Sequence, residues 1–163
     1  MHVTKPDWFR RAAAVVLGVL LAIAAGSPNA FARQTIALTI PGFNTIDLIS
    51  FSTTTSATPP AAKCGQVVVL KHIDQASSFL LTQVFLGQHT QRMTITFKND
   101  TTGVVFYTLD LEDVLVKEVT QSDSASASQL TETVTLIAVR YKYTFSAPTA
   151  LTAGYDCAAQ KTI

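Results

Sequence analysis

Apolar and polar residues alternate along most of the chain beyond residue 33, and this period of two predicts antiparallel β-strands. The first such stretch runs from Gln34 to Ile40 and stops at Pro41-Gly42, a turn signal. In the last, the parity of the apolar positions changes around Leu136-Ile137, which predicts a bulge or burial on both faces. Strands are predicted over residues 34–40, 45–56, 65–73, 93–98, 105–111, 114–119 and 130–145.

Two of these strands carry further signals. The strand at 45–56 changes phase near its middle, and the strand at 65–73 contains an uninterrupted apolar run, which is typical of burial on both faces.

The segments between the strands contain turn and loop residues. Hydroxyl residues at 53–56 and then Pro59-Pro60 predict a loop, because proline cannot donate to a strand ladder. Gly103 is expected to supply the positive φ of a hairpin, and the acidic pair Glu112-Asp113 is expected to separate two strands. The serine- and alanine-rich segment 121–128 is predicted to be a surface loop.

One helix is predicted between Asp74 and Gly87. The Asp74 carboxylate can cap its N-terminus, and Gly87 suits the left-handed position just after the last turn. The apolar side chains expected to pack against a sheet or a barrel mouth are Phe79, Leu80, Leu81, Val84, Phe85 and Leu86. Many strands with a single helix indicate a mainly β fold class, most simply a small antiparallel β-barrel or sandwich with one α-helix.

A different pattern precedes the strands. Lys5, Arg10 and Arg11 lead into an apolar run at 12–25, and the cleavage pattern Ala30-Phe31-Ala32 follows. The alternative of an uncleaved membrane anchor is disfavoured, because the run is too short to span a bilayer easily. We therefore expect residues 1–32 to be a cleaved signal peptide, residues 33–163 to be one domain, and the mature protein to be periplasmic or secreted.

The net charge of the chain limits the classes of partner that it can bind. The formal net charge of the chain is +1 at pH 7, which points to no polyanionic partner such as a nucleic acid. Without the leader the domain is nearly neutral and rich in threonine, a β-branched residue. Copies of such a domain repel each other weakly, which permits self-association. No membrane contact is expected after the leader is cleaved.

The two cysteines, Cys64 and Cys157, lie in the mature domain. In an oxidising compartment they most simply form one disulfide. Free thiols and a metal site are the alternatives, but no Cys-x-x-Cys pair or histidine cluster accompanies them. On the loop-entropy model the disulfide would stabilise the fold by roughly 4 to 5 kcal/mol.

A resemblance to a known family is carried by residues 46–52 (IDLISFS), 71–80 (KHIDQASSFL), 86–89 (LGQH), 109–116 (LDLEDVLV), 131–136 (TETVTL) with Tyr143, and Tyr155-Asp156. In these stretches and in the order of its elements the chain resembles the Hcp family, the haemolysin-coregulated tube proteins of type VI secretion systems. The resemblance implies a compact β-barrel with a helix at one side. It also implies hexameric rings that stack into a tube, which is expelled and can carry effectors in its lumen.

The chain differs from the family pattern at three places. It begins with a leader, and its connection at 41–45 is tight where the family carries a longer loop used in ring contacts. Ser78 replaces a proline.

Residue types suited to hydrolysis occur near the predicted helix. His72, Asp74 and Ser77 could form a triad, but no Gly-x-Ser-x-Gly elbow is present and the three lie within six residues. Capping and turn roles are favoured instead. A metal shared by His72 and His89 would lack a carboxylate or thiolate cluster of known spacing.

The acidic residues give no catalytic pattern either. Asp110 and Glu112-Asp113 are interpreted as a solvated strand end rather than as a paired acid and base. We therefore expect no catalytic residue, no cofactor and no metal site, and we expect that the protein is not an enzyme.

These observations favour an exported, non-catalytic Hcp-like structural protein that forms hexameric rings, with a type VI tube or effector carrier as its possible use. Its expected partners are copies of itself and secreted effectors or other secretion components. The alternative is a secreted β-sandwich binding module or a fimbria-like surface subunit. A small secreted hydrolase would need a catalytic constellation that the sequence lacks.

Overall fold

The computed structural model of the protein describes residues 33–58, 61–123, 129–146 and 149–163. The predicted signal peptide, 1–32, and residues 124–128 of the predicted surface loop lie outside the described residues. The strands are β1 (Gln34–Thr39), β2 (Ile46–Thr53), β3 (Ser56–Thr58), β4 (Ala61–Lys63), β5 (Val67–His72), β6 (His89–Asn99), β7 (Val105–Ser122), β8 (Thr131–Phe145), β9 (Leu151–Asp156) and β10 (Lys161–Thr162), and the helix is α1 (Gln75–Leu86).

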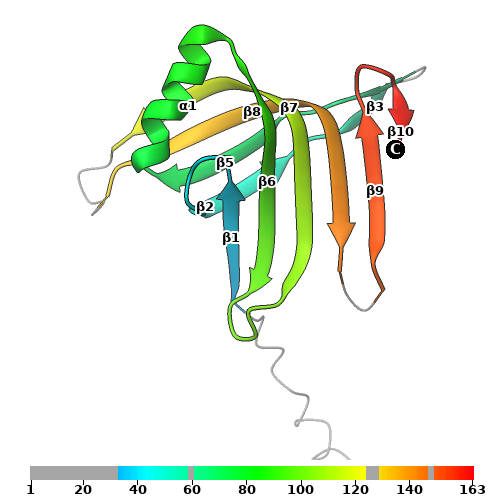
Figure 1. The fold of residues 1–163 in the computed structure, drawn as a ribbon, viewed down its shortest axis with the longest axis horizontal. Helices are drawn as coiled ribbons and strands as arrows, with labels where there is room; N and C mark the ends of the chain where they lie inside the picture. Colours follow the sequence, from blue (N-terminus) through cyan, green and yellow to red (C-terminus); the bar gives the residue numbers. More distant parts are fainter. Residues whose placement is uncertain (1–32, 59–60, 124–128, 147–148) are drawn as a thin grey trace, which may run out of the picture. The chain divides into compact units, whose positions relative to one another are not determined.

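Six of the strands close into an antiparallel barrel in the order β1-β2-β5-β8-β7-β6. The mainly β fold class, a small barrel with a single helix, is therefore confirmed. Figure 1 shows α1 at the end of the barrel opposite the turn that joins β6 to β7.

Strand β8 is shared by two neighbours on one edge. Its first half, from Thr131 to Leu136, pairs with β5 and closes the barrel. Its second half, from Arg140 to Phe145, pairs with β9, while β7 pairs along the other edge of both halves. The sheet therefore forks at residues 137–139, and β9 and β10 extend it beyond the barrel.

The core fills the barrel with aliphatic side chains from every barrel strand and from α1. Its fully buried large members are Leu38, Ile40, Val67, Val69, Leu80, Met93, Ile95, Leu109, Leu111 and Leu136. Phe97 stacks edge-on against Phe51 and Tyr107, with ring centroids 5.1 Å and 5.0 Å apart, and these rings fill the end of the barrel away from α1.

The first three barrel strands lie within the ranges predicted from alternation. The change of phase predicted in the second strand corresponds to a register irregularity between Leu48 and Ser50. In β5 the structure corrects the expectation of burial on both faces. Val67 and Val69 are fully buried, but Val68 between them is only half-buried, so one face of β5 points into the barrel.

The predicted break at Glu112-Asp113 is wrong, because β7 runs through it as one strand. Asp113 has φ 56, in the left-handed region, which aspartate tolerates better than most residues. The inward-facing positions change parity at this residue, from Leu111 to Val114. The acidic pair thus stays within β7, and the left-handed conformation of Asp113 coincides with the change in which side chains face inward.

Strand β8 changes parity at the same level of the sheet. Its buried positions alternate through Leu136 and Ala138 and then switch to Tyr141, so the change lies slightly beyond the predicted Leu136-Ile137. The register irregularity between these strands falls in β7, between Val116 and Glu118.

Four further strands were not expected. Strands β3 and β4, on either side of residues 59–60 in the segment predicted to be a loop, pair with each other, and β9 and β10 follow the last predicted strand. These short segments lack a long apolar alternation, and their pairing partners decide their conformation.

The helix has the predicted limits, but its apolar face is narrower than expected. Its buried residues are Ala76, Ser77, Leu80 and Gln83. Phe85 and Leu86 are 82% and 59% exposed, although they were expected to pack inward. At 3.6 residues per turn, Phe85 lies on the helix face opposite Ala76 and Leu80, and Leu86 lies to one side of the buried face. No helix among the described residues has the length and apolar content needed to cross a membrane.

Candidate functional site

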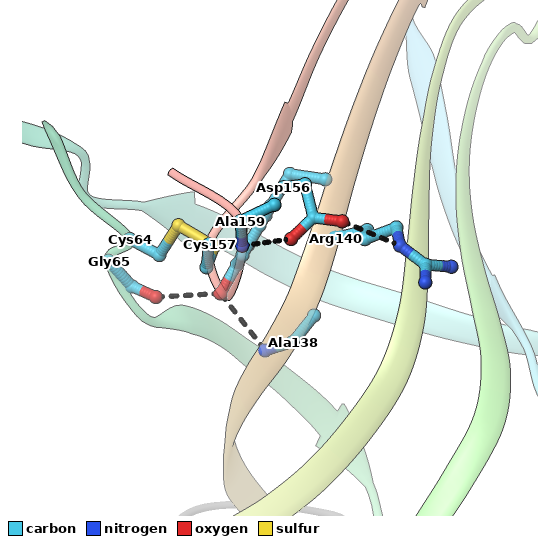
Figure 2. The surroundings of a disulfide bond; sticks show 8 residues. Cys64, Gly65, Ala138, Arg140, Asp156, Cys157 and Ala159 are labelled. Carbon is cyan, nitrogen blue, oxygen red and sulfur yellow. Dashed lines mark hydrogen bonds and ion pairs between the residues drawn. A yellow bond between two sulfur atoms is a disulfide. The ribbon is translucent and has the colours of Figure 1, made fainter. Parts of the chain in front are cut away.

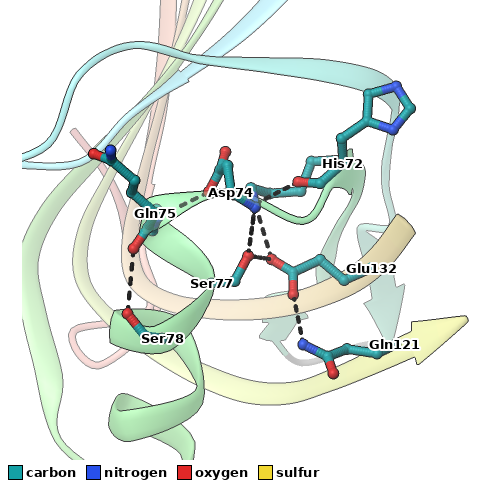
Figure 3. Close-up of polar contacts among 9 residues, drawn as sticks. His72, Asp74, Gln75, Ser77, Ser78, Gln121 and Glu132 are labelled. Atoms are coloured by element: carbon teal, nitrogen blue, oxygen red, sulfur yellow. Dashed lines mark hydrogen bonds and ion pairs between the residues drawn. The ribbon is translucent and has the colours of Figure 1, made fainter. Parts of the chain in front are cut away.

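The residues at the start of α1 form a capping box. Asp74 is the N-cap, and its carboxylate accepts a hydrogen bond of 2.8 Å from the Ala76 amide. Ser77 Oγ in turn accepts a 3.0 Å hydrogen bond from the Asp74 amide. His72 is exposed, and Figure 3 shows its ring turned away from Asp74 and Ser77. The three residues therefore do not assemble as a triad.

Asp74 and Ser77 instead contact a buried ion pair that joins the helix to two strands (Figure 3). Lys71 Nζ lies 2.9 Å from Glu132 Oε1 and 2.9 Å from Asp74 Oδ1. Ser77 Oγ donates to Glu132 Oε1 at 2.7 Å. Lys71 Nζ also donates to the His72 carbonyl at 2.8 Å, and both Lys71 and Glu132 have side chains that are 0% exposed.

The Ser77 hydroxyl is not accessible in this cluster. Ser77 is only 4% exposed, and its hydroxyl proton is directed at a carboxylate that is already paired with Lys71. A nucleophile must reach the substrate, and here the helix and the sheet cover it.

Sequence reasoning missed Lys71 and Glu132. Lys71 lies two residues after Val69 and Glu132 two residues before Val134, so each occupies an inward-facing position of its strand. Two charges of opposite sign at such positions on otherwise apolar strand faces were the signal that could have identified the pair.

The second histidine lies in a different contact. His89 Nδ1 is 2.7 Å from Asp113 Oδ1, and both side chains are about half exposed. Within the described ranges, no three side chains of the metal-binding types lie together. His89 therefore helps to hold the left-handed residue of β7 in place.

A ladder of charged residues crosses the outer face of four strands. Arg92, Glu112, Arg140 and Asp156 are direct cross-strand partners on β6, β7, β8 and β9. Arg140 Nη1 lies 2.8 Å from Glu112 Oε2, and Arg140 Nε lies 3.0 Å from Asp156 Oδ2. The charges alternate in sign, so every carboxylate of the ladder has a guanidinium neighbour. The interpretation of Glu112 as part of a solvated strand end is therefore corrected.

The ladder also shifts the titration of its members. The Ala159 amide and the Arg140 guanidinium hold the pKa of Asp156 below its usual range. Hydrogen bonds to Glu112 and Asp156 raise the pKa of Arg140. A shallow hollow of about 540 Å³ lies beside the ladder, and it is lined by Pro41, Gln91, Arg92, Glu112, Asp113 and Arg140. Among the lining residues, Arg92 and Arg140 both contact the Glu112 carboxylate.

The two cysteines meet at the fork of β8 (Figure 2). Cys64 and Cys157 are joined by a disulfide, with Cα atoms 5.9 Å apart, and they are 93 positions apart in sequence. Beside the disulfide, the Tyr141 hydroxyl donates to the Gly65 carbonyl at 2.7 Å. Burial raises the pKa of Tyr141. A side chain at position 65 would overlap the Thr54 carbonyl, so only glycine fits there.

Six of the exposed large apolar side chains form two patches. The helix-end patch consists of Phe85 and Leu86, just before β6. The strand-end patch lies at the other end of β6, where Phe145 pairs with Leu151 and with Tyr107. Its members are Val104, Val105, Phe145 and Leu151, which are 56%, 36%, 49% and 70% exposed. Strand β6 has 11 residues, so the two patches are roughly 35 Å apart.

The model of one protein family matches residues 43–145, and its description is type VI secretion system effector, Hcp. The matched segment runs from the start of β2 to the end of β8 and makes up more than half of the chain. The chain belongs to the Hcp family.

Solved Hcp structures have the same fold. Hcp1 from Salmonella typhimurium is 22% identical, with a TM-score of 0.70 over 80% of this chain and 99% of that chain. A type VI secretion system effector from Yersinia pestis is 17% identical, with a TM-score of 0.67 over 74% of this chain and 98% of that chain. The secreted protein Hcp3 from Pseudomonas aeruginosa is 16% identical, with a TM-score of 0.60 over 76% and 96%. Comparison with curated protein sequences gives no match.

The Hcp match divides the features of the site into two groups. The buried ion pair, the capping box and Cys64 lie inside the matched residues 43–145. Strands β9 and β10, Asp156 and Cys157 lie beyond them. The disulfide thus ties the family barrel to a segment that the family match does not include.

Proposed function

We propose that this Hcp-family chain is an exported, non-catalytic structural protein that assembles with its own copies into closed rings of six, which serve as a tube segment or effector carrier in type VI secretion. The observation that carries the proposal is the pair of exposed apolar patches at the two ends of β6. The number six comes from the family resemblance.

Two different patches on one molecule favour a head-to-tail contact. In such a contact the helix-end patch of one copy meets the strand-end patch of the next. Repetition of the contact gives a ring when the rotation closes and a filament when it does not. Burying Phe85, Leu86, Phe145 and Leu151 removes large apolar side chains from water, which is the main favourable term in association.

The chemistry of the domain supports a structural role. The polar clusters described above are paired internally, and the buried serine is inaccessible. The closed barrel also disfavours the fimbria-like alternative, because a donor strand needs an incomplete sheet to enter.

The experiment compares two variants of the secreted protein by size-exclusion chromatography with light scattering. Phe85→Ser/Leu86→Ser removes the helix-end patch, and Phe145→Thr/Leu151→Thr removes the strand-end patch. Each variant alone is expected to be monomeric, whereas the wild type forms a ring. An equimolar mixture is expected to form dimers and nothing larger, because each partner keeps one intact patch.

Ile49→Thr is the matched control. Ile49 is 46% exposed on β2 and belongs to neither patch, so its replacement is expected to leave the ring intact. A monomeric wild type at tens of micromolar, or rings in both patch variants, would rule out the proposed contact.

A further inference from the structure

Strand β9 is held to the rest of the domain mainly along one edge. One edge pairs with β8 over six residues, and on the other edge β10 pairs only with Tyr155 and Asp156. No β9 side chain is buried: the first three are exposed and the last three are half-buried. The strand therefore has little apolar anchoring of its own, and segments of this kind open at low free energy.

The two ends of β9 are held differently. At Leu151 the strand is close in sequence to β8, which keeps this end near its partner. At the other end the disulfide ties Cys157 to Cys64, beside a 2.8 Å hydrogen bond from the Cys157 amide to the Val139 carbonyl. Without the disulfide, residues 157–163 would be a free C-terminal end held by hydrogen bonds, next to the Arg140–Asp156 pair. The Arg140 side chain is 49% exposed and the Asp156 side chain 13%, so this pair is partly hydrated and its contribution is modest.

We propose that the Cys64–Cys157 disulfide is a redox latch on the β9–β10 segment. With the disulfide intact, β9 stays on the edge of β8. With the disulfide reduced, β9 opens from its Cys157 end, while the six-stranded barrel keeps its pairing through β5 and β8. Both cysteines are half-buried rather than enclosed, so a thiolate can approach the sulfur atoms.

The reductant of the latch is a dithiol. One thiolate of the dithiol attacks a cysteine sulfur, breaks the S–S bond and forms a mixed disulfide. Its second thiol then attacks the mixed disulfide and releases the other cysteine sulfur. Two electrons and two protons pass to the protein, which gains two thiols, and the dithiol becomes a disulfide.

The latch has a consequence that rests on the proposed function. Leu151, on β9, supplies part of the strand-end patch beside Phe145. When β9 opens from its Cys157 end, Leu151 stays near β8 but loses its fixed place beside Phe145, so reduced protein lacks a complete assembly contact. Ring formation would then be confined to oxidised protein, after export.

Amide hydrogen exchange on the full secreted protein tests the latch without relying on assembly. The samples are oxidised protein, the same protein reduced with dithiothreitol, and the Cys64→Ser/Cys157→Ser variant. Amides of residues 151–156 are expected to exchange at least tenfold faster in both disulfide-free samples. Amides of β6 and β7 are expected to stay within twofold. Arg140→Gln with the disulfide intact is the control, and it should leave β9 protected.

Unchanged exchange at 151–156 after reduction would overturn the latch. Loss of protection throughout β6 and β7 would overturn it too, because the disulfide would then support the whole fold. Light scattering on the same samples addresses the assembly separately. Selective opening of β9 in a protein that is monomeric in both redox states would uphold the latch and count against the proposed ring.

Discussion

At Lys71 and Glu132 two full charges lie in a core otherwise built from aliphatic side chains. Removing each charge from water costs several kcal/mol, and the cost is offset only when geometry and additional hydrogen bonds are good. Here the two residues are direct cross-strand partners, and Ser77, Asp74 and Gln121 supply the remaining contacts. Removal of one partner would leave the other charged and buried.

Glu132→Ala is therefore expected to lower the free energy of unfolding by about 3–5 kcal/mol. The double replacement Lys71→Met/Glu132→Leu removes both charges and keeps apolar volume, so it should recover most of that loss. Denaturant unfolding followed by circular dichroism measures both. A double variant as unstable as the single one would show that the damage comes from packing rather than from an unpaired charge.

Asp156 offers a residue-scale test by titration. Its pKa is lowered first by the Ala159 amide and then by Arg140. A group with a depressed pKa stabilises the folded state at pH values above its ordinary range, and this contribution is lost as the pH falls through the folded pKa. NMR titration of the Asp156 carboxyl should give a midpoint below 3.8, and Arg140→Gln should move it only part of the way back. A midpoint unchanged by Arg140→Gln would mean that the guanidinium does not act on Asp156.

At the scale of the elements, α1 begins and ends where the capping residues in the sequence predict. Asp74 has an extended backbone at the N-cap, and Gly87 has φ 59 after the last turn. Asp74→Ala removes the cap and one partner of Lys71, and it should cost about 1–2 kcal/mol of unfolding free energy.

Ser78→Ala is the control for that prediction. The Ser78 hydroxyl bonds only to the Gln75 carbonyl on the exposed side of α1, so its loss is expected to change stability by less than about 0.5 kcal/mol. Chemical denaturation of the two variants side by side makes the comparison. Equal stability of both would show that the cap contributes nothing here.

Strand alternation predicted the barrel strands because their inward positions are apolar over long stretches. It failed at Asp113, where a residue in the left-handed region lets β7 continue through an acidic pair. It also failed for β9, whose sequence carries no buried position and whose pairing with β8 comes from tertiary contact. Local patterns cannot show which neighbour a strand edge will meet.

The candidate site likewise combines features that the local sequence predicts with features that come only from tertiary contact. Asp74 and Ser77 were noticed as residue types, but their partners lie elsewhere on β5 and β8. The ladder through Arg92, Glu112, Arg140 and Asp156 exists only because four strands come into register. Capping roles could be predicted from the sequence alone, whereas these ion pairs depend on pairings far apart in the chain.

For the whole molecule, the proposed export makes a direct prediction about the N-terminus. Expression of the full chain should give mature protein beginning at Arg33 in the periplasmic or external fraction, because the cleavage pattern ends at Ala32. That protein should contain no free thiol, since its two cysteines are paired. Edman sequencing and thiol titration measure these two properties. Intact leader on cytosolic protein with two free thiols would contradict the export proposal.

The closure of the barrel through β5 and β8 has a kinetic consequence. Strands β6, β7 and β8 follow one another along the chain, so their pairing closes short loops. Lys71 and Glu132 are 61 residues apart, and Ile36 and Phe97, which pair across β1 and β6, are equally far apart, so both pairings carry a larger chain-entropy cost and should form late. A slip of one residue in the β5–β8 pairing would turn the two charges toward opposite faces. The buried pair therefore penalises a wrong register when the barrel closes, and only a correctly closed barrel brings Cys64 to Cys157.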